Sequence, residues 1–251
     1  IGARLYYVIF KFGDYIGNPL SIFYVWQGGL AIHGGIIGGF IGAYLFAKKR
    51  KINLWVLTDM AVGALLFGQF LGRFGNLANG EIHGVPTFTP LSVIFSGRFN
   101  EWWVRYQSMS ASMQARFKEV VPWGLKFPLD TPAGSEFPNL PLHPAMLYEG
   151  FLNLIAFIIL WFYFRKKEKN PGVLTMIYLI MYALIRMFVS TFRAEDLRVP
   201  GTTIRMPYLI SIIMIVIAVI GIVYFSNPKR KFVPVNEVKK NLNETKETKK
   251  D

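Results

Sequence analysis

Cysteine is absent from the 251 residues of this sequence, and charged residues are scarce. The first absence excludes disulfide bonds, cysteine-ligated metals and a cysteine nucleophile, so any thiol that reacts here must arrive with a substrate. Charged residues make up 17% of the chain, whereas soluble domains average about 25%. Hydrophobic residues make up 53% and gather in long runs. A disordered chain, a coiled coil and an ordinary soluble domain are therefore excluded.

The long apolar runs predict a polytopic, all-α membrane protein. Five runs of 19–21 residues are long enough to cross a bilayer, which takes about 20 residues. A shorter run at the start resembles the outer half of a crossing, so we expect the chain to be truncated there. It lacks the basic start and small-residue cleavage site of a signal peptide. The crossings are expected near residues 1–10 (partial), 28–47, 54–73, 145–164, 172–192 and 207–225.

The net charge of +13 is explained by membrane topology. Basic clusters follow every second crossing, and the positive-inside rule places such ends in the cytoplasm. Residues 80–143 then lie outside as a small, neutral head between the middle helices, with a helix-like stretch at 99–120 and an irregular one at 124–142. Residues 1–225 form the membrane domain, and 226–251 form a basic, disordered cytoplasmic tail close to anionic membrane lipids. A nucleic-acid partner is not predicted.

Polar residues inside apolar runs carry the functional information, because a charge at the bilayer centre costs about 2.5–3.5 kcal/mol on insertion scales. His33 opens a helix in which the spacing of Gly34, Gly38 and Gly42 allows another backbone to approach closely. Packing alone accounts for these glycines. For His33, a plain interfacial helix cap is the alternative to a chemical role.

A denser polar cluster lies at the outer end of the next crossing. Gln69, Arg73 and Asn76 fall on one stripe of a helix, and Asn79 and Glu81 follow. The glycines between them leave room for a bulky ligand. A single arginine that extends to the lipid headgroups would explain Arg73 alone, but not the amides and the carboxylate beside it.

A third cluster lies on the crossing at 172–192. Tyr182, Arg186 and Ser190 recur every four residues, and Arg193 follows. An unpaired arginine is untenable at the depth of Arg186, so its partner is either an anionic ligand or an acidic side chain, with Glu149 the best internal candidate. Arginines on two separate helices suit one phosphate, and a phospholipid headgroup supplies it at that depth.

At these residues the sequence resembles the prolipoprotein diacylglyceryl transferase family of bacteria. The resemblance rests on Gly72-Arg73-Phe74-Gly75-Asn76-Leu77-Ala78-Asn79-Gly80-Glu81 followed by Gly84. Further similar stretches surround Arg4, His33, His143 to Glu149, and Tyr182 to Arg193. The sequence departs from the family at Ser190, where a glutamate is usual, and at Ala183, where glycine is frequent. The family's first membrane helix is also absent.

The resemblance implies a reaction in the bacterial cell membrane, and the basic clusters place the C-terminus in the cytoplasm. The family moves the diacylglyceryl group of phosphatidylglycerol onto the lipobox cysteine of a prolipoprotein signal peptide, and glycerol phosphate leaves. Arg73 and Arg186 would neutralise the departing phosphate. His33 would take the thiol proton, since an imidazole has a pKa of about 6.5; alternatively it orients the headgroup and another group or water takes the proton.

The remaining site residues implied by the resemblance would bind substrate, and no cofactor is needed. The histidines at 33, 83 and 143 form no i+3 or i+4 pair, so no metal site is predicted. The expected substrate-binding residues are Arg4, Gln69, Asn76, Asn79, Glu81, Gly84, Tyr148, Glu149, Tyr182 and Arg193.

Three other functions compete with the transferase. A transporter or binding protein for an anionic lipid or solute also uses glycine-rich helices and buried arginine, but the internal repeat typical of a transporter is not found. An intramembrane protease lacks its serine motif or aspartate pair here. A non-catalytic lipid-binding scaffold stays open.

Overall fold

The computed structural model describes residues 1–167, 170–195 and 197–227. These residues are mostly helical, and the only strand-like pairing among them is four isolated bridges, so the predicted all-α fold class is confirmed. The chain divides into two compact units, Ile1–Thr58 and Asp59–Asp251. Each is described by itself.

The first unit is built on a close contact between two helices, α1 (Gly2–Phe10) and α2 (Ile32–Arg50), joined by the 3₁₀ turns η1 (Phe12–Tyr15), η2 (Pro19–Phe23) and η3 (Val25–Gln27). A Cβ added to Gly2 would lie 2.5 Å from the carbonyl oxygen of Gly34 and 2.9 Å from the Cα of Gly38. The predicted role of these two α2 glycines in packing is therefore confirmed. A Cβ on Gly42 meets nothing within 4 Å in the described part of the chain.

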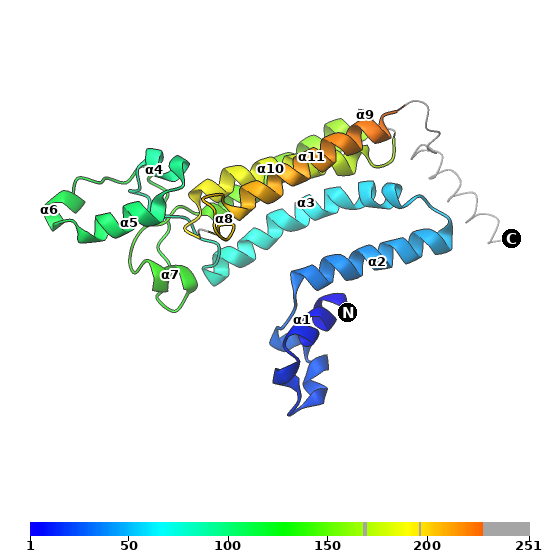
Figure 1. Ribbon diagram of the computed structural model, residues 1–251, viewed down its shortest axis with the longest axis horizontal. Helices are drawn as coiled ribbons and strands as arrows, with labels where there is room; N and C mark the ends of the chain where they lie inside the picture. The colour runs from blue at the N-terminus through cyan, green and yellow to red at the C-terminus, as the bar shows by residue number, and fades with distance from the viewer. Residues whose placement is uncertain (168–169, 196, 228–251) are drawn as a thin grey trace. The chain divides into compact units, whose positions relative to one another are not determined.

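The second unit is a bundle of long helices with a head at one end (Figure 1). The helix α10 packs against both α8 and α11. A π-helical turn, η4, carries α8 onward into α9 without a break. The elements of this part of the chain are α3 (Leu54–Asn79, which starts in the first unit), α4 (Leu91–Ser96), α5 (Phe99–Ser108), α6 (Ala111–Gln114), α7 (Pro132–Glu136), α8 (Ala145–Ile159), η4 (Leu160–Phe164), α9 (Arg165–Lys167), α10 (Val173–Phe192) and α11 (Met206–Phe225).

Large apolar side chains cover the outside of the long helices as well as the core. Ile213, Ile217 and Val223 of α11 are exposed, whereas Leu66 and Val189 are buried between the helices. An apolar surface of this extent is typical of a membrane interaction. Among the described residues, four helices are long and apolar enough to cross a membrane: Leu54–Asn79, Ala145–Lys167, Val173–Phe192 and Met206–Phe225.

These four helices agree with the crossings predicted near 54–73, 145–164, 172–192 and 207–225. The crossing predicted at 28–47 falls on α2, which is not among the four, and the partial one at 1–10 falls on α1. Insertion of α1 and α2 into the membrane stays a prediction.

The head, between α3 and α8, has a small core of its own. Val85, Ile94, Phe99, Phe137 and Leu142 are buried together. The helix-like stretch expected at 99–120 is shorter in the structure, where α5 ends at Ser108 and α6 covers Ala111–Gln114. The stretch at 124–142 is irregular as expected, apart from the one turn of α7.

At the end opposite the head, Asp59 of α3 caps α10. Its carboxylate accepts hydrogen bonds from the backbone N–H of Gly172 (2.7 Å) and from the N–H and hydroxyl of Thr175 (2.8 and 2.6 Å). The first N–H groups of a helix lack intrahelical partners, and its N-terminus attracts negative charge. Asp59, a charge inside an apolar run, is thereby stabilised. Of the tail predicted at 226–251, residues 228–251 lie outside the described part of the chain.

Candidate functional site

Two arginines from different helices share one buried carboxylate at the head end of the bundle. Glu149 of α8 has no exposed side-chain surface. Its Oε1 forms an ion pair with Nη2 of Arg73 on α3, and its Oε2 lies 3.5 Å from Nη1 of Arg186 on α10. The arginine side chains keep 17% and 24% of their surface exposed. The predicted pairing of Arg186 with Glu149 is confirmed. The pairing of Glu149 with Arg73 was not predicted.

A glycine next to Glu149 allows α3 to reach it. A Cβ on Gly150 would lie 3.2 Å from the Cβ of Arg73, closer than most real Cβ contacts. Arg73 then continues a chain of hydrogen bonds along α3: its Nη1 donates to Oδ1 of Asn76 (3.0 Å), and Nδ2 of Asn76 donates to Oε2 of Glu81 (3.1 Å). The predicted polar stripe therefore exists, and it links the buried Glu149 to the exposed Glu81.

Further polar residues lie along the same three helices, α3, α8 and α10. Gln69, four residues before Arg73, donates from Nε2 to the hydroxyl of Tyr178 on α10 (3.1 Å). Asn153, four residues after Glu149, is fully buried, and neither amide atom has a hydrogen-bond partner in the described chain. The aromatic ring of Tyr182 stacks on that of Tyr178. Asn153 and Tyr178 were missed from the sequence, although the four-residue spacing from Glu149 was a usable signal for Asn153.

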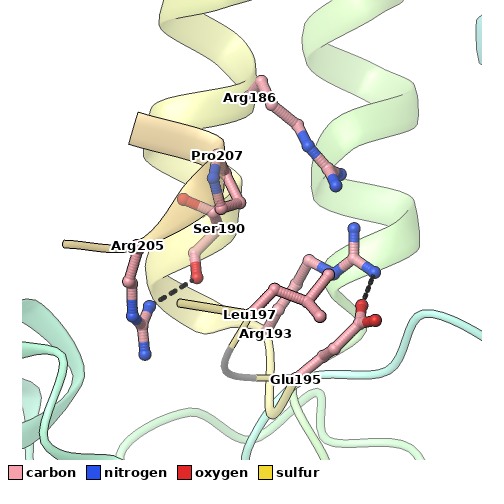
Figure 2. Close-up of a pocket in the computed structure, with 7 residues that line it drawn as sticks. All are labelled: Arg186, Ser190, Arg193, Glu195, Leu197, Arg205 and Pro207. Atoms are coloured by element: carbon pink, nitrogen blue, oxygen red, sulfur yellow. Dashed lines mark hydrogen bonds and ion pairs between the residues drawn. The ribbon is translucent and has the colours of Figure 1, made fainter. Parts of the chain in front are cut away.

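Arg193 follows the last residue of α10 and adds a third guanidinium close to the cluster. It forms an ion pair with the exposed carboxylate of Glu195. Burial lowers the pKa of Arg193 from its ordinary value, and the nearby charge of Arg186 lowers it further. Arg186, Ser190 and Arg193 surround one pocket (Figure 2). Its volume of about 10 Å³ is room for about one water molecule.

Three segments of the chain meet at Gly84, and one of them carries Arg193. Its N–H donates to the carbonyl of His143 (2.9 Å), and it pairs with Arg193 in an isolated antiparallel bridge. A Cβ on Gly84 would lie 2.5 Å from the His143 carbonyl oxygen and 2.7 Å from that of Phe192. Because both neighbours are backbone atoms, a side chain there would displace the segments that hold Arg193.

Tyr148 lies beside Glu149 in the sequence but joins a different network. Its hydroxyl accepts from Nε1 of Trp123 (2.8 Å) and lies 3.1 Å from Nδ1 of His143. Burial lowers the pKa of His143 from 6.5 to about 4, so its imidazole is neutral at pH 7.

Two of the remaining predicted site residues, Arg4 and His33, belong to the first unit, and a third, Asn79, ends α3. Arg4 is buried in the first unit and donates four hydrogen bonds to backbone carbonyls, those of Ser21, Ile22, Gly28 and Gly29. His33, in the same unit, is exposed, with its ring 6.0 Å from that of Tyr6. Asn79 is the exposed last residue of α3. The contacts of Arg4 indicate that it holds the 3₁₀ turns together; substrate roles for Arg4, His33 and Asn79 stay predictions.

No metal centre is formed by the residues that the structure describes. Among them, no group of three or more histidine, aspartate or glutamate side chains is placed to hold an ion. The chemistry of the cluster is that of guanidinium, amide and carboxylate groups, which suits recognition of a phosphate.

Comparison with known proteins places the chain in a family. The model of the family described as prolipoprotein diacylglyceryl transferase matches residues 1–224. A phosphatidylglycerol–prolipoprotein diacylglyceryl transferase of Fusobacterium nucleatum subsp. nucleatum is 54% identical over 222 residues, 87% of this chain and 76% of the relative. A protein of the same name from Synechococcus elongatus is 34% identical over 93% of this chain and 71% of its own length. One from Clostridium botulinum (strain Loch Maree / Type A3) is 35% identical over 92% of this chain and 78% of its own length. The chain therefore belongs to the prolipoprotein diacylglyceryl transferase family.

Proposed function

We propose that this protein transfers the diacylglyceryl group of phosphatidylglycerol to the thiol of the lipobox cysteine in the signal peptide of prolipoproteins. Membership of the family supports this activity, and the names of its relatives state both substrates. The composition agrees with it, because a chain without cysteine must receive the thiol from its substrate.

The observation that carries the proposal is the sharing of Glu149 by Arg73 and Arg186. Two guanidinium groups and one carboxylate leave one positive charge in a largely buried place. The phosphodiester of phosphatidylglycerol carries one negative charge and would balance it. Charge-assisted bonds from arginine to phosphate are about twice as strong as neutral hydrogen bonds, so the headgroup can compete with Glu149 for both guanidinium groups.

In the reaction the cysteine sulfur forms a thioether bond to the glycerol carbon of the diacylglyceryl group. The bond from that carbon to the phosphate oxygen breaks, its electron pair leaves with the oxygen, and the thiol proton passes to a base. Negative charge therefore grows on the phosphate, where Arg73 and Arg186 meet it, with Arg193 close by as a third cation. One well-placed donor at such a position contributes about 3–4 kcal/mol to the transition state.

The neighbouring polar residues would orient the lipid. Asn76, Asn79 and Glu81 would bind the glycerol of the headgroup, with Asn76 also bracing Arg73. His33 is the proposed base for the thiol proton; in the alternative it orients the headgroup, and water takes the proton. Gln69, Gly84, Tyr148, Tyr182 and Arg4 would shape or support the site.

In the proposed orientation the protein lies in a bacterial cell membrane, with the head and the arginine cluster on the outer side and the C-terminus in the cytoplasm. Lys48, Lys49 and Arg50 end α2, and Arg165, Lys166 and Lys167 form α9, as the positive-inside rule requires of cytoplasmic ends. The prolipoprotein presents its lipobox at the outer leaflet, and membrane lipids surround the bundle.

The test is an assay of purified protein with phosphatidylglycerol and a lipobox peptide, read by the mass of the peptide. The peptide should gain one diacylglyceryl group while glycerol phosphate appears in equal amount. Arg73→Gln and Arg186→Gln should each lower the rate about 10²–10³-fold, whereas Arg116→Gln, an exposed arginine of the head, should not. An unmodified peptide with the parent protein, or equal rates in all variants, would refute the proposal. Flux of an anionic solute into vesicles without modification would indicate a transporter.

A further inference from the structure

A hollow lined by arginine lies between the head and the start of α11, apart from the residues discussed above. It consists of two adjoining pockets of about 360 and 270 Å³ that share Ser96, Arg98 and Glu101. Arg198 and Arg205 line the larger pocket and Arg105 the smaller one. Pockets that bind small ligands have volumes of about 300–1,000 Å³, so the larger pocket can hold a small molecule.

The loop between α10 and α11 presents two of these arginines side by side. Arg198 and Arg205 face each other in an isolated antiparallel bridge, and the N–H of Val199 donates to the carbonyl of Ile204 across the same turn (2.9 Å). Residues directly opposite in an antiparallel pair place their side chains on one face. Both arginines line the larger pocket, so the loop presents two guanidinium groups to the same hollow.

A turn of the head brings the same arginines to the pocket wall. Nη2 of Arg198 donates to the carbonyl of Gly97 (3.2 Å), the residue that ends α4 with a φ of +71°. A Cβ on Gly97 would lie 3.3 Å from Nε of Arg205. The glycine therefore supplies both the turn and the space in which Arg205 approaches, with Arg98 next along the chain.

Arg205 also connects this hollow to the arginine cluster. It lines the small pocket with Arg186 and Arg193, and its Nη1 donates to the carbonyl of Ser190 (2.9 Å; Figure 2). Arg205 is buried, whereas Arg98 is exposed. The guanidinium groups thus lead from the shared carboxylate, past Arg193 and Arg205, to the surface of the head.

We propose that this hollow binds the phosphate monoester that the reaction releases, glycerol phosphate, on its way out. The inference rests on the proposed function, in which this product forms at Arg73 and Arg186. A small phosphate dianion cannot leave through hydrocarbon, because burying its charge there is too costly. It needs a cationic route to water, and arginine binds phosphate with two parallel hydrogen bonds. Within the described chain, the lining holds four arginines and one glutamate.

Product inhibition tests this route. Glycerol phosphate, added to the parent protein in mixed micelles with phosphatidylglycerol and a lipobox peptide, should inhibit transfer, and glycerol should not. Arg98→Gln and Arg198→Gln should each raise the inhibition constant about tenfold, the effect of losing one charge-assisted hydrogen bond. Arg116→Gln, an exposed arginine of the head outside the hollow, should leave it unchanged. Arg98 is exposed, so its replacement does not endanger folding.

Two outcomes would overturn the route: transfer by the parent protein without inhibition by glycerol phosphate, or equal inhibition constants in parent, Arg98→Gln and Arg198→Gln. Failure of the proposed function looks different, since the parent protein would then modify no peptide. In that case binding is read directly from the ³¹P line width of glycerol phosphate with the same proteins. Broadening by the parent that Arg98→Gln weakens supports the anion site, and equal broadening refutes it.

Discussion

Removing the charge of Glu149 should destabilise the protein through the two arginines that it joins. In Glu149→Gln, Arg73 and Arg186 face each other without their shared carboxylate. Loss of one partner of a buried ion pair costs about 3–5 kcal/mol, and the 17% and 24% exposure of the arginines favours the lower end of this range. At about 2–4 °C per kcal/mol for a chain of this size, we expect the Tm to fall by roughly 6–12 °C.

The assay is thermal unfolding in a neutral detergent, with and without short-chain phosphatidylglycerol. A phosphate that binds both guanidinium groups replaces the lost carboxylate, so the lipid should raise the Tm of Glu149→Gln more than that of the parent protein. Glu119→Gln, an exposed residue of the head, is the control and should match the parent. An unchanged Tm in Glu149→Gln, or equal stabilisation of both proteins by the lipid, would refute the reasoning.

Three further perturbations test the surroundings of the cluster. His143 has a pKa of about 4 when folded and 6.5 when unfolded, so between these pH values only the unfolded state binds its proton. The free energy of unfolding should therefore fall by up to about 3 kcal/mol as the pH drops from 6.5 to 4. In urea titrations, His143→Gln should flatten this pH dependence. Gly84→Ala should cost about 1–3 kcal/mol by overpacking and should lower transfer activity. Gly75→Ala should not destabilise the protein, because a Cβ there meets no described residue within 4 Å. Equal Tm values for the two variants would contradict this. Asp59→Ala should lower stability by about 1–2 kcal/mol because α10 loses its cap, with transfer at low temperature retained; a Tm equal to that of the parent would exclude the cap.

The positions of the cluster residues in the sequence were predictable because the bilayer penalises charge. Glu149 and Arg186 are isolated charges in apolar runs, and the structure places both in one ion-pair cluster. Helical periodicity likewise predicted the stripe of Arg73 and Asn76, which share a hydrogen bond. The four long apolar helices follow directly from the length and composition of the runs.

The partners of the charges were less accessible, because pairing depends on how helices rotate against each other. Arg73 reaches Glu149 only because Gly150 brings α3 close, a contact that no spacing within one helix reveals. Arg4 satisfies its guanidinium with backbone carbonyls, and every residue has a carbonyl, so no sequence signal distinguishes those acceptors. The partner of Asp59 was equally inaccessible, because it is a backbone N–H at the N-terminus of another helix and nearly every residue has such a group.

The central claim is that Arg73 and Arg186 bind one lipid phosphate in place of their shared carboxylate. An experimental structure with a non-reactive analogue of phosphatidylglycerol tests it most directly. Phosphate oxygens should lie about 2.7–2.9 Å from both guanidinium groups, with Glu149 displaced from at least one of them. A phosphate bound elsewhere, with Glu149 still joining both arginines, would contradict the account.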